Sequence, residues 1–211
     1  MAEGYRTILA PAQDEFLERK SRFIGHIAPA ETEEEAVAFV NSVRERHREA
    51  THNVYAYVLR DNQLMRFSDD GEPQGTAGKP VLEVILREGL VDVAVVVTRY
   101  FGGILLGAGG LVRAYAQGAK TAVDAAQRLN MHPAAVLELD LGYDFYGKAT
   151  YLLPQHEVQV LDSVFAEGVR LRLLCKAARL PAFARDLTEL SSGTVAPLVL
   201  EEKFAHFPEE G

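Results

Sequence analysis

The stretch "TRYFGGILLGAGGLVRAY", Thr98–Tyr115, joins an apolar run to a helical pattern through five glycines. Before it, Val93–Val97 is apolar at every position, which is typical of a central strand covered on both faces. After it, apolar residues recur at helical spacing and predict a long amphipathic helix. The predicted inward stripe of that helix is Ala108, Val112, Tyr115, Ala119, Ala122 and Ala126.

The glycines between strand and helix have two interpretations. They stand where free backbone N–H groups and the helix dipole favour an anion, so the candidate anion-binding residues are Gly102, Gly103, Gly107, Gly109 and Gly110. The sequence contains no P-loop motif, G-x-x-x-x-G-K-[ST]. A possible dinucleotide-binding motif, G-x-G-x-x-G, has Val112 in place of its third glycine. Spacing alone favours the second interpretation, in which glycine allows tight turns and close helix–sheet packing.

The residues upstream predict alternating strands and helices. Thr32 and Glu35 have capping-box spacing at the start of a helix. Pro80 suits the first turn of a second helix. The predicted elements of this half are a strand at 22–30, a helix after residue 32, a strand at 52–59 with a hairpin partner at 63–67, and a short helix at 80–88.

The composition changes at "RLNMHPA", residues 128–134, which we interpret as a linker. The predicted domains are therefore residues 1–130 and 134–211. The second contains, in order, a strand at 135–142, a helix at 146–153, a hairpin at 158–176, a helix at 181–192 and a strand at 194–202. This β-α-β-β-α-β order predicts a ferredoxin-like domain, so the fold class is α+β.

Charge and composition restrict the class of partner. The 211-residue chain is 48% apolar and has a net charge of −8. Both halves are acidic, −3 before Asn130 and −5 from there on, which disfavours a charge-driven nucleic-acid binder, and no DNA partner is expected. No run reaches the roughly 20 apolar residues of a membrane span, and no signal peptide is evident. The single Cys175 fits a reducing compartment, so the cytoplasm is the expected location.

The acidic loop "SDDGEPQGTAGK", residues 68–79, also has two interpretations. Asp69, Asp70 and Glu72 offer the oxygen ligands of a divalent cation, but the spacing of a calcium-binding EF-hand is absent. A solvated acidic turn explains the same residues and is favoured. The six histidines show no zinc-ligand spacing. The sequence thus predicts no metal and no cofactor.

Polar residues cluster where predicted strands end, and loops at sheet ends carry most functional sites. His52 is a candidate general base, but no adjacent nucleophile completes a catalytic triad. The candidate functional cleft consists of Lys20, Arg22, His52, Asn53, Asp69, Asp70, Glu72, Lys79, Arg99, Tyr100 and Arg113.

Four blocks of the first half together resemble the Impact family and its bacterial YigZ-type members. They are "KSRFIGH", "HNVYAYVL", "DDGEPQGTAGKPVLEVI" and "VVVTRYFGGILLGAGGLVRAYAQGA", which span most of Lys20–Ala119 in this order. The second half is similar, by element order, to the family's smaller C-terminal domain of unknown function, itself similar to a domain of elongation factor G.

The resemblance implies an N-terminal domain with the fold of ribosomal protein S5 domain 2. It also implies a translation-associated regulatory protein without enzymatic activity, which binds the ribosome, RNA or a protein partner. The alternative is an enzyme that handles a phosphate or nucleotide. That enzyme would use Arg99 and Arg113 as anion partners at the glycine-rich corner, with Asp69, Asp70 or Glu72 as base or metal ligand.

Overall fold

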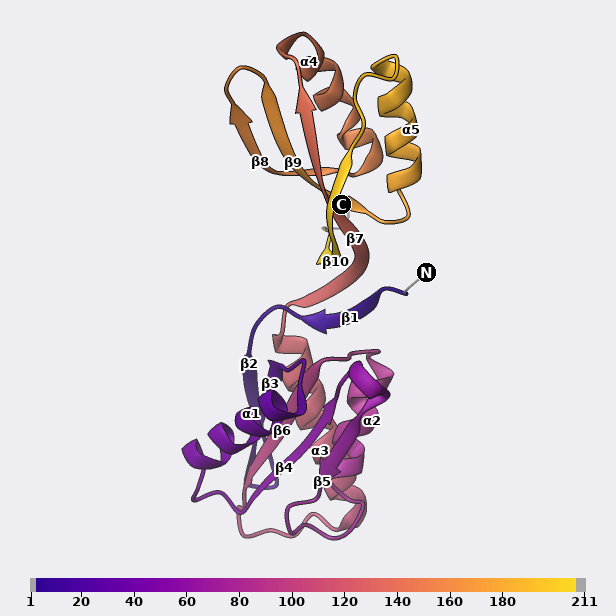
Figure 1. Ribbon diagram of the computed structural model, residues 1–211. Helices are drawn as coiled ribbons and strands as arrows, with labels where there is room; N and C mark the ends of the chain where they lie inside the picture. Colours follow the sequence, from indigo (N-terminus) through magenta and orange to yellow (C-terminus); the bar gives the residue numbers. More distant parts are fainter. Residues whose placement is uncertain (1–2, 208–211) are drawn as a thin grey trace. The chain divides into compact units, whose positions relative to one another are not determined.

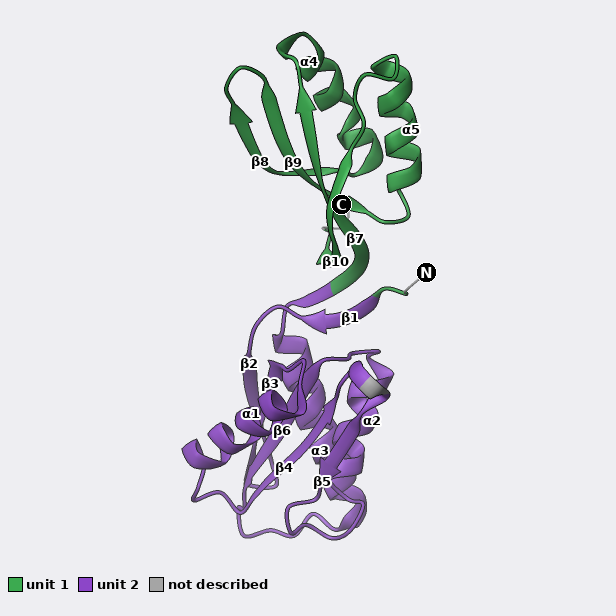
Figure 2. Cartoon of the chain, viewed as in Figure 1, with its two compact units in different colours: residues 1–4, 130–211 green, residues 5–129 purple. Residues whose placement is uncertain are grey.

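The computed structural model describes residues 3–207, with every side chain in that range except that of Asn62. The chain divides into two compact units, one of residues 5–129 and one of residues 1–4 and 130–211 (Figure 2). Each unit contains its own β-sheet and its own apolar core. This agrees with the expected α+β class.

The first unit is built on a five-stranded antiparallel sheet in the order β2-β3-β6-β4-β5 (Figure 1). A short strand, β1, precedes it, and Arg6 of β1 forms an isolated bridge with Leu90. The strands of this unit are β1 (Tyr5–Ile8), β2 (Ala12–Glu18), β3 (Ser21–Pro29), β4 (His52–Val58), β5 (Met65–Ser68) and β6 (Val93–Tyr100).

Helices cover both faces of this sheet. They are α1 (Glu33–Arg46), α2 (Gly78–Arg87) and α3 (Ala108–Ala125), with a short 3-10 helix at Asp61–Gln63. Val95 and Val97 of β6 belong to the core shared with α2 and α3, whereas Val96 packs with Val40 and Val43 of α1. The prediction that residues 93–97 form a central strand covered on both faces is confirmed.

The helix after the glycines forms as predicted, and Tyr115, Ala119 and Ala122 of its predicted stripe are buried. At its start the prediction was wrong: Ala108 and Val112 are exposed, while Leu111 and Ala114 are buried. Gly25 of β3 and Gly118 of α3 explain how closely α3 approaches the sheet, because a Cβ on Gly25 would lie 2.1 Å from the Gly118 carbonyl oxygen. Two small residues rather than a large apolar one define this contact, so the apolar periodicity of the sequence does not reveal it.

The second unit has the ferredoxin-like arrangement. Its own strands have the antiparallel order β10-β7-β9-β8, and its elements follow in the order β-α-β-β-α-β; β1 is the fifth strand of this sheet and pairs with β7. They are β7 (Arg128–Leu141), α4 (Tyr143–Leu152), a 3-10 helix (Pro154–His156), β8 (Gln159–Phe165), β9 (Val169–Lys176), α5 (Leu180–Leu190) and β10 (Leu198–His206). Leu137, Leu139 and Phe183 are fully buried in its core.

Several sequence-based boundaries were wrong. Residues 128–134 are not a linker but the first half of β7. The strands at 5–8 and 12–18 were not predicted, because charged residues interrupt the alternation that marks a strand. β10 begins at Leu198, four residues later than predicted, and α2 begins two residues before Pro80.

No helix within residues 3–207 is long and apolar enough to cross a membrane.

Candidate functional site

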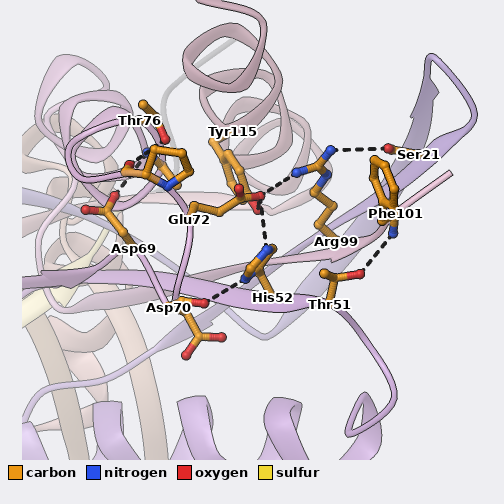
Figure 3. Close-up of polar contacts among 12 residues, drawn as sticks. Ser21, Thr51, His52, Asp69, Asp70, Glu72, Thr76, Arg99, Phe101 and Tyr115 are labelled. Carbon is orange, nitrogen blue, oxygen red and sulfur yellow. Dashed lines mark hydrogen bonds and ion pairs between the residues drawn. The ribbon is translucent and has the colours of Figure 1, made fainter. Parts of the chain in front are cut away.

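The polar centre of the first unit is an ion pair between β6 and the loop that joins β5 to α2. A guanidinium nitrogen of Arg99 lies 2.6 Å from a carboxylate oxygen of Glu72 (Figure 3). The side chains are only 6% and 5% exposed. Because both charges have left water, the pair depends on close geometry and further hydrogen bonds.

Two more side chains converge on the same Glu72 oxygen. The Tyr115 hydroxyl, from α3, donates a hydrogen bond of 2.7 Å, and Nε2 of His52, at the start of β4, lies 3.7 Å away (Figure 3). Burial, followed by the hydrogen bond to Glu72, raises the pKa of the Tyr115 phenol well above its ordinary value of 10.0. Glu72 thus connects a loop, a strand and a helix.

The rest of the Arg99 side chain lies among aromatic rings. Its guanidinium carbon is 5.5 Å from the centre of the Phe23 ring and 5.4 Å from that of Phe101, which is cation–π range. A terminal nitrogen is 3.5 Å from the Ser21 hydroxyl. Arg99 Nε has no hydrogen-bond partner among the described residues. The side chain is therefore held by packing as much as by its charge.

The Asp69 carboxylate is hydrogen-bonded to backbone N–H groups. Its two carboxylate oxygens accept hydrogen bonds from the N–H groups of Gly75 (2.8 Å), Ala77 (3.1 Å) and Gly78 (2.8 Å). The last two stand at the start of α2, whose N-cap residue Ala77 offers no capping side chain. A remote carboxylate therefore caps this helix and complements its dipole.

Asp70 ties the loop to β4 and α1. Its carboxylate accepts from the Asn53 backbone N–H at 2.7 Å and pairs with Arg44 at 2.7 Å. Its carbonyl oxygen lies 2.7 Å from His52 Nδ1. A carbonyl can only accept, so Nδ1 of His52 carries a proton and Nε2 faces Glu72.

The glycine-rich turn has a packing explanation at several positions. A Cβ on Gly102 would lie 2.0 Å from the carbonyl carbon and oxygen of Lys20, and the Gly102 N–H donates to the Ser21 hydroxyl at 3.2 Å. Gly103 and Gly107 have φ values of +83° and +74°, in the region that favours glycine. Anion binding at this turn remains a prediction.

Five predicted cleft residues do not join the Glu72 network: four basic residues and Tyr100. Arg22 pairs with Glu15 at 2.5 Å. The other basic residues are Lys20, exposed with a positive φ; Lys79, exposed and 4.0 Å from Glu83; and Arg113, exposed beside Gly109.

Tyr100, another predicted cleft residue, bonds through its hydroxyl to His47 Nδ1 at 2.9 Å. Within residues 3–207, no three His, Cys, Asp or Glu side chains are placed to hold a metal.

Two members of the network were missed as site residues. They are Tyr115, assigned only to the inward stripe of its helix, and Arg44, which lies in the last turn of α1. For Tyr115 a signal existed, because a tyrosine on a buried stripe needs a partner for its hydroxyl.

Comparison with known proteins identifies the family to which the chain belongs. Residues 19–123 match the Impact N-terminal domain, and residues 139–194 match a domain of unknown function, DUF1949. IMPACT family member YvyE of Bacillus subtilis is 36% identical over 194 residues, covering 92% of this chain and 89% of the relative. Member YigZ of Escherichia coli is 39% identical over 187 residues, covering 87% and 92%. The chain therefore belongs to the IMPACT family.

A more distant relative and a solved structure are also similar to this chain. Protein IMPACT of Xenopus laevis is 38% identical over 96 residues, which are 43% of this chain and 30% of that protein. A crystal structure described as a hypothetical protein is 38% identical, with a TM-score of 0.59 over 96% of this chain and 100% of that chain. The match to the bacterial relatives extends through both units, whereas the match to the eukaryotic protein covers less than half of the chain.

Proposed function

We propose that this protein acts in translation as a regulatory protein without enzymatic activity, by binding the ribosome, RNA or a protein partner, and that a protein partner is the most favoured of the three. The observation that carries this proposal is that Asp69, Asp70 and Glu72, the acidic residues of the loop at 68–79, are paired within the chain. Arg99 neutralises Glu72, Arg44 neutralises Asp70, and Asp69 accepts three backbone hydrogen bonds. Groups used in this way hold a loop in place and are not free for a substrate.

The contacts around Glu72 and Arg99 also fix the position of an exposed apolar loop. They position the loop after β6, whose residues Phe101, Ile104 and Leu105 are 45%, 40% and 81% exposed. The Phe101 N–H is held by the Thr51 hydroxyl at 3.0 Å, and Gly102 by Ser21. An apolar loop fixed on a rigid sheet end suits protein recognition better than chemistry. The net charge of −8 favours a protein over RNA.

Sedimentation of cross-linked cell lysate tests the proposal. Cells that carry the tagged chain are treated with formaldehyde, lysed and fractionated on a sucrose gradient, with and without ribonuclease. We expect the chain in ribosomal fractions and a shift toward the top after ribonuclease. A chain that stays at the top of the gradient in cross-linked lysate, with no other protein cross-linked to it, contradicts the proposal.

The alternative, a phosphate- or nucleotide-handling enzyme, is supported by the buried Glu72 carboxylate with His52 and Tyr115 beside it. It requires a ligand that stabilises the fold. A ligand at 100 times its Kd adds about 2.7 kcal/mol, which raises the Tm of a chain of this size by roughly 5 to 10 °C. We expect no such shift in a screen of nucleotides and phosphorylated metabolites with and without Mg²⁺. A shift of this size that disappears in Glu72→Gln favours the enzyme.

A further inference from the structure

A small cleft lies between the turn that joins β2 to β3 and the first turns of α3. It has a volume of about 140 Å³, and its lining residues are Glu18, Arg19, Leu106, Gly110, Arg113, Ala114 and Gln117. Leu106 and Ala114 are buried and contribute apolar lining, while the two arginines are exposed. We call it the Arg19–Arg113 cleft.

The positive charges of the two guanidinium groups in the cleft are not balanced by a close carboxylate. Arg113 makes no hydrogen bond or ion pair among the described residues. Arg19 donates to the Leu105 carbonyl at 3.4 Å and reaches Glu18 only at 4.0 Å. This contrasts with Arg99 and Arg44, whose charges are matched at 2.6 and 2.7 Å. In a chain with a net charge of −8, the cleft is a local positive site that attracts a negative group.

The rim of the cleft is apolar and held in place. Leu105 is 81% exposed and Ile104 is 40% exposed, and both belong to the loop whose Gly102 contacts the Lys20 backbone. The bond from Arg19 to the Leu105 carbonyl joins this loop to the β2–β3 turn. A fixed apolar residue beside uncompensated cations complements a segment that carries both apolar and acidic side chains.

We propose that the Arg19–Arg113 cleft binds a carboxylate of an acidic, apolar segment of a protein partner, with Leu105 against the apolar side chains of that segment. The inference rests on the proposed binding function and specifies the partner's chemistry. A guanidinium matches the geometry of a carboxylate, and a carboxylate side chain is small enough for the cleft. Glu18 in the lining opposes a nucleic-acid backbone. Leu105, the exposed residue whose carbonyl contacts Arg19, is aliphatic and offers no ring on which a base could stack.

A peptide titration tests the inference with the full chain. The probe is a fluorescein-labelled peptide of twelve residues that alternates Glu with Leu, and its control replaces Glu by Gln. Binding is followed by fluorescence anisotropy, and its site by amide chemical shifts of the labelled protein. We expect the Glu peptide to bind about tenfold more tightly than the Gln peptide, the size of effect of one charge-assisted contact. The shifts should concentrate at residues 18–20 and 104–117.

Matched variants separate the cleft from general charge. Arg113→Gln should weaken the Glu peptide about tenfold and leave the Gln peptide unchanged. Arg87→Gln, on the exposed end of α2, removes the same charge elsewhere and should change neither. Leu105→Ser should weaken both peptides severalfold, because the apolar contact is common to them.

Three results would overturn the inference: equal losses in Arg113→Gln and Arg87→Gln, a twelve-residue uridine RNA that binds as tightly as the Glu peptide, or no saturable peptide binding up to about 1 mM, the weak end of specific affinity. If the peptide fails while the cross-linked chain still sediments with ribosomes, only the inference fails. If the chain also leaves the ribosomal fractions and is cross-linked to no other protein, the proposed function fails with it.

Discussion

Arg99 and Glu72 are 27 residues apart in the chain, and their charged groups meet at 2.6 Å in a nearly water-free position. The pair closes the loop between β5 and α2 over the end of β6. Tyr115 and His52 then bring α3 and β4 to the same carboxylate. The loop between β5 and α2 is therefore held by charged and polar contacts of Glu72 rather than by apolar side chains.

Asp69→Ala should destabilise the first unit by about 1 to 2 kcal/mol, because it leaves the N-terminus of α2 without its cap. Urea unfolding followed by circular dichroism measures the change. Glu34→Ala is the control, since Glu34 lies exposed in the first turn of α1 and makes no such cap. Equal losses in the two variants would mean that Asp69 is not a helix cap.

Tyr115→Phe should cost about 1.5 to 3 kcal/mol, the range for a hydrogen bond to a charged group. The variant should also change the alkaline limb of the stability profile. The phenol pKa is raised in the folded state, so the stabilisation is complete below the unfolded value of 10.0 and is lost as the pH rises above it. Unfolding measured between pH 8 and about pH 11 should therefore show a steeper loss for the original chain than for Tyr115→Phe. Parallel profiles would contradict this role of Tyr115.

Gly102→Ala should destabilise the chain more than Gly103→Ala does. A Cβ at position 102 meets the Lys20 backbone at 2.0 Å, and backbone cannot move aside without disturbing the β2–β3 turn. A Cβ at position 103 meets nothing within 4 Å, and only its positive φ costs about 1 kcal/mol. Thermal unfolding of both variants measures the difference. A larger loss at position 103 would show that backbone conformation, not close packing, governs this turn.

His26, buried in β3, should make the first unit acid-sensitive. Neither ring nitrogen has a hydrogen-bond partner among the described residues, and burial, with His47 and Arg46 nearby, lowers its pKa to about 4 from 6.5. The neutral ring is therefore favoured by folding, and this stability is full above pH 6.5 and lost as the pH falls toward 4. The loss amounts to about 3 kcal/mol.

The histidine ring signals in a proton NMR titration report the His26 pKa directly. His26→Leu should flatten the stability profile between pH 6.5 and 4. His132→Leu, in the second unit, is the control and should leave the profile of the first unit unchanged. A His26 that titrates near 6.5 would refute the prediction.

Much of the fold could be predicted from local pattern. Thr32 and Glu35 form the predicted capping box at the start of α1, with the Glu35 N–H bonded to the Thr32 hydroxyl at 3.2 Å. The hairpin of β8 and β9 and the strand at 93–97 were likewise readable from alternation and continuous apolar runs. These features depend on neighbours within a few residues, which a sequence displays directly.

The partners of the polar residues could not be predicted in the same way. Spacing placed Glu72, His52 and Arg99 at strand ends and loops, but which carboxylate meets which cation depends on sheet register and on the path of the loop. Arg113 illustrates the limit, because it was grouped with Arg99 and instead lies beside Arg19 in a separate cleft. Long-range contacts of this kind are set by packing and not by local pattern.

A double-mutant cycle on Glu72 and Arg99 tests the central claim, that this buried pair stabilises the fold rather than being kept free for a substrate. The free energy of unfolding is measured by urea for the original chain, Glu72→Gln, Arg99→Met and the double variant. Glu72→Gln should cost about 3 to 5 kcal/mol because it leaves a buried cation unpaired, and the double variant should recover about 2 kcal/mol or more of the summed losses. A Glu72→Gln chain as stable as the original, or more stable, would contradict the claim, since that is the behaviour of a catalytic carboxylate kept at a cost to the fold.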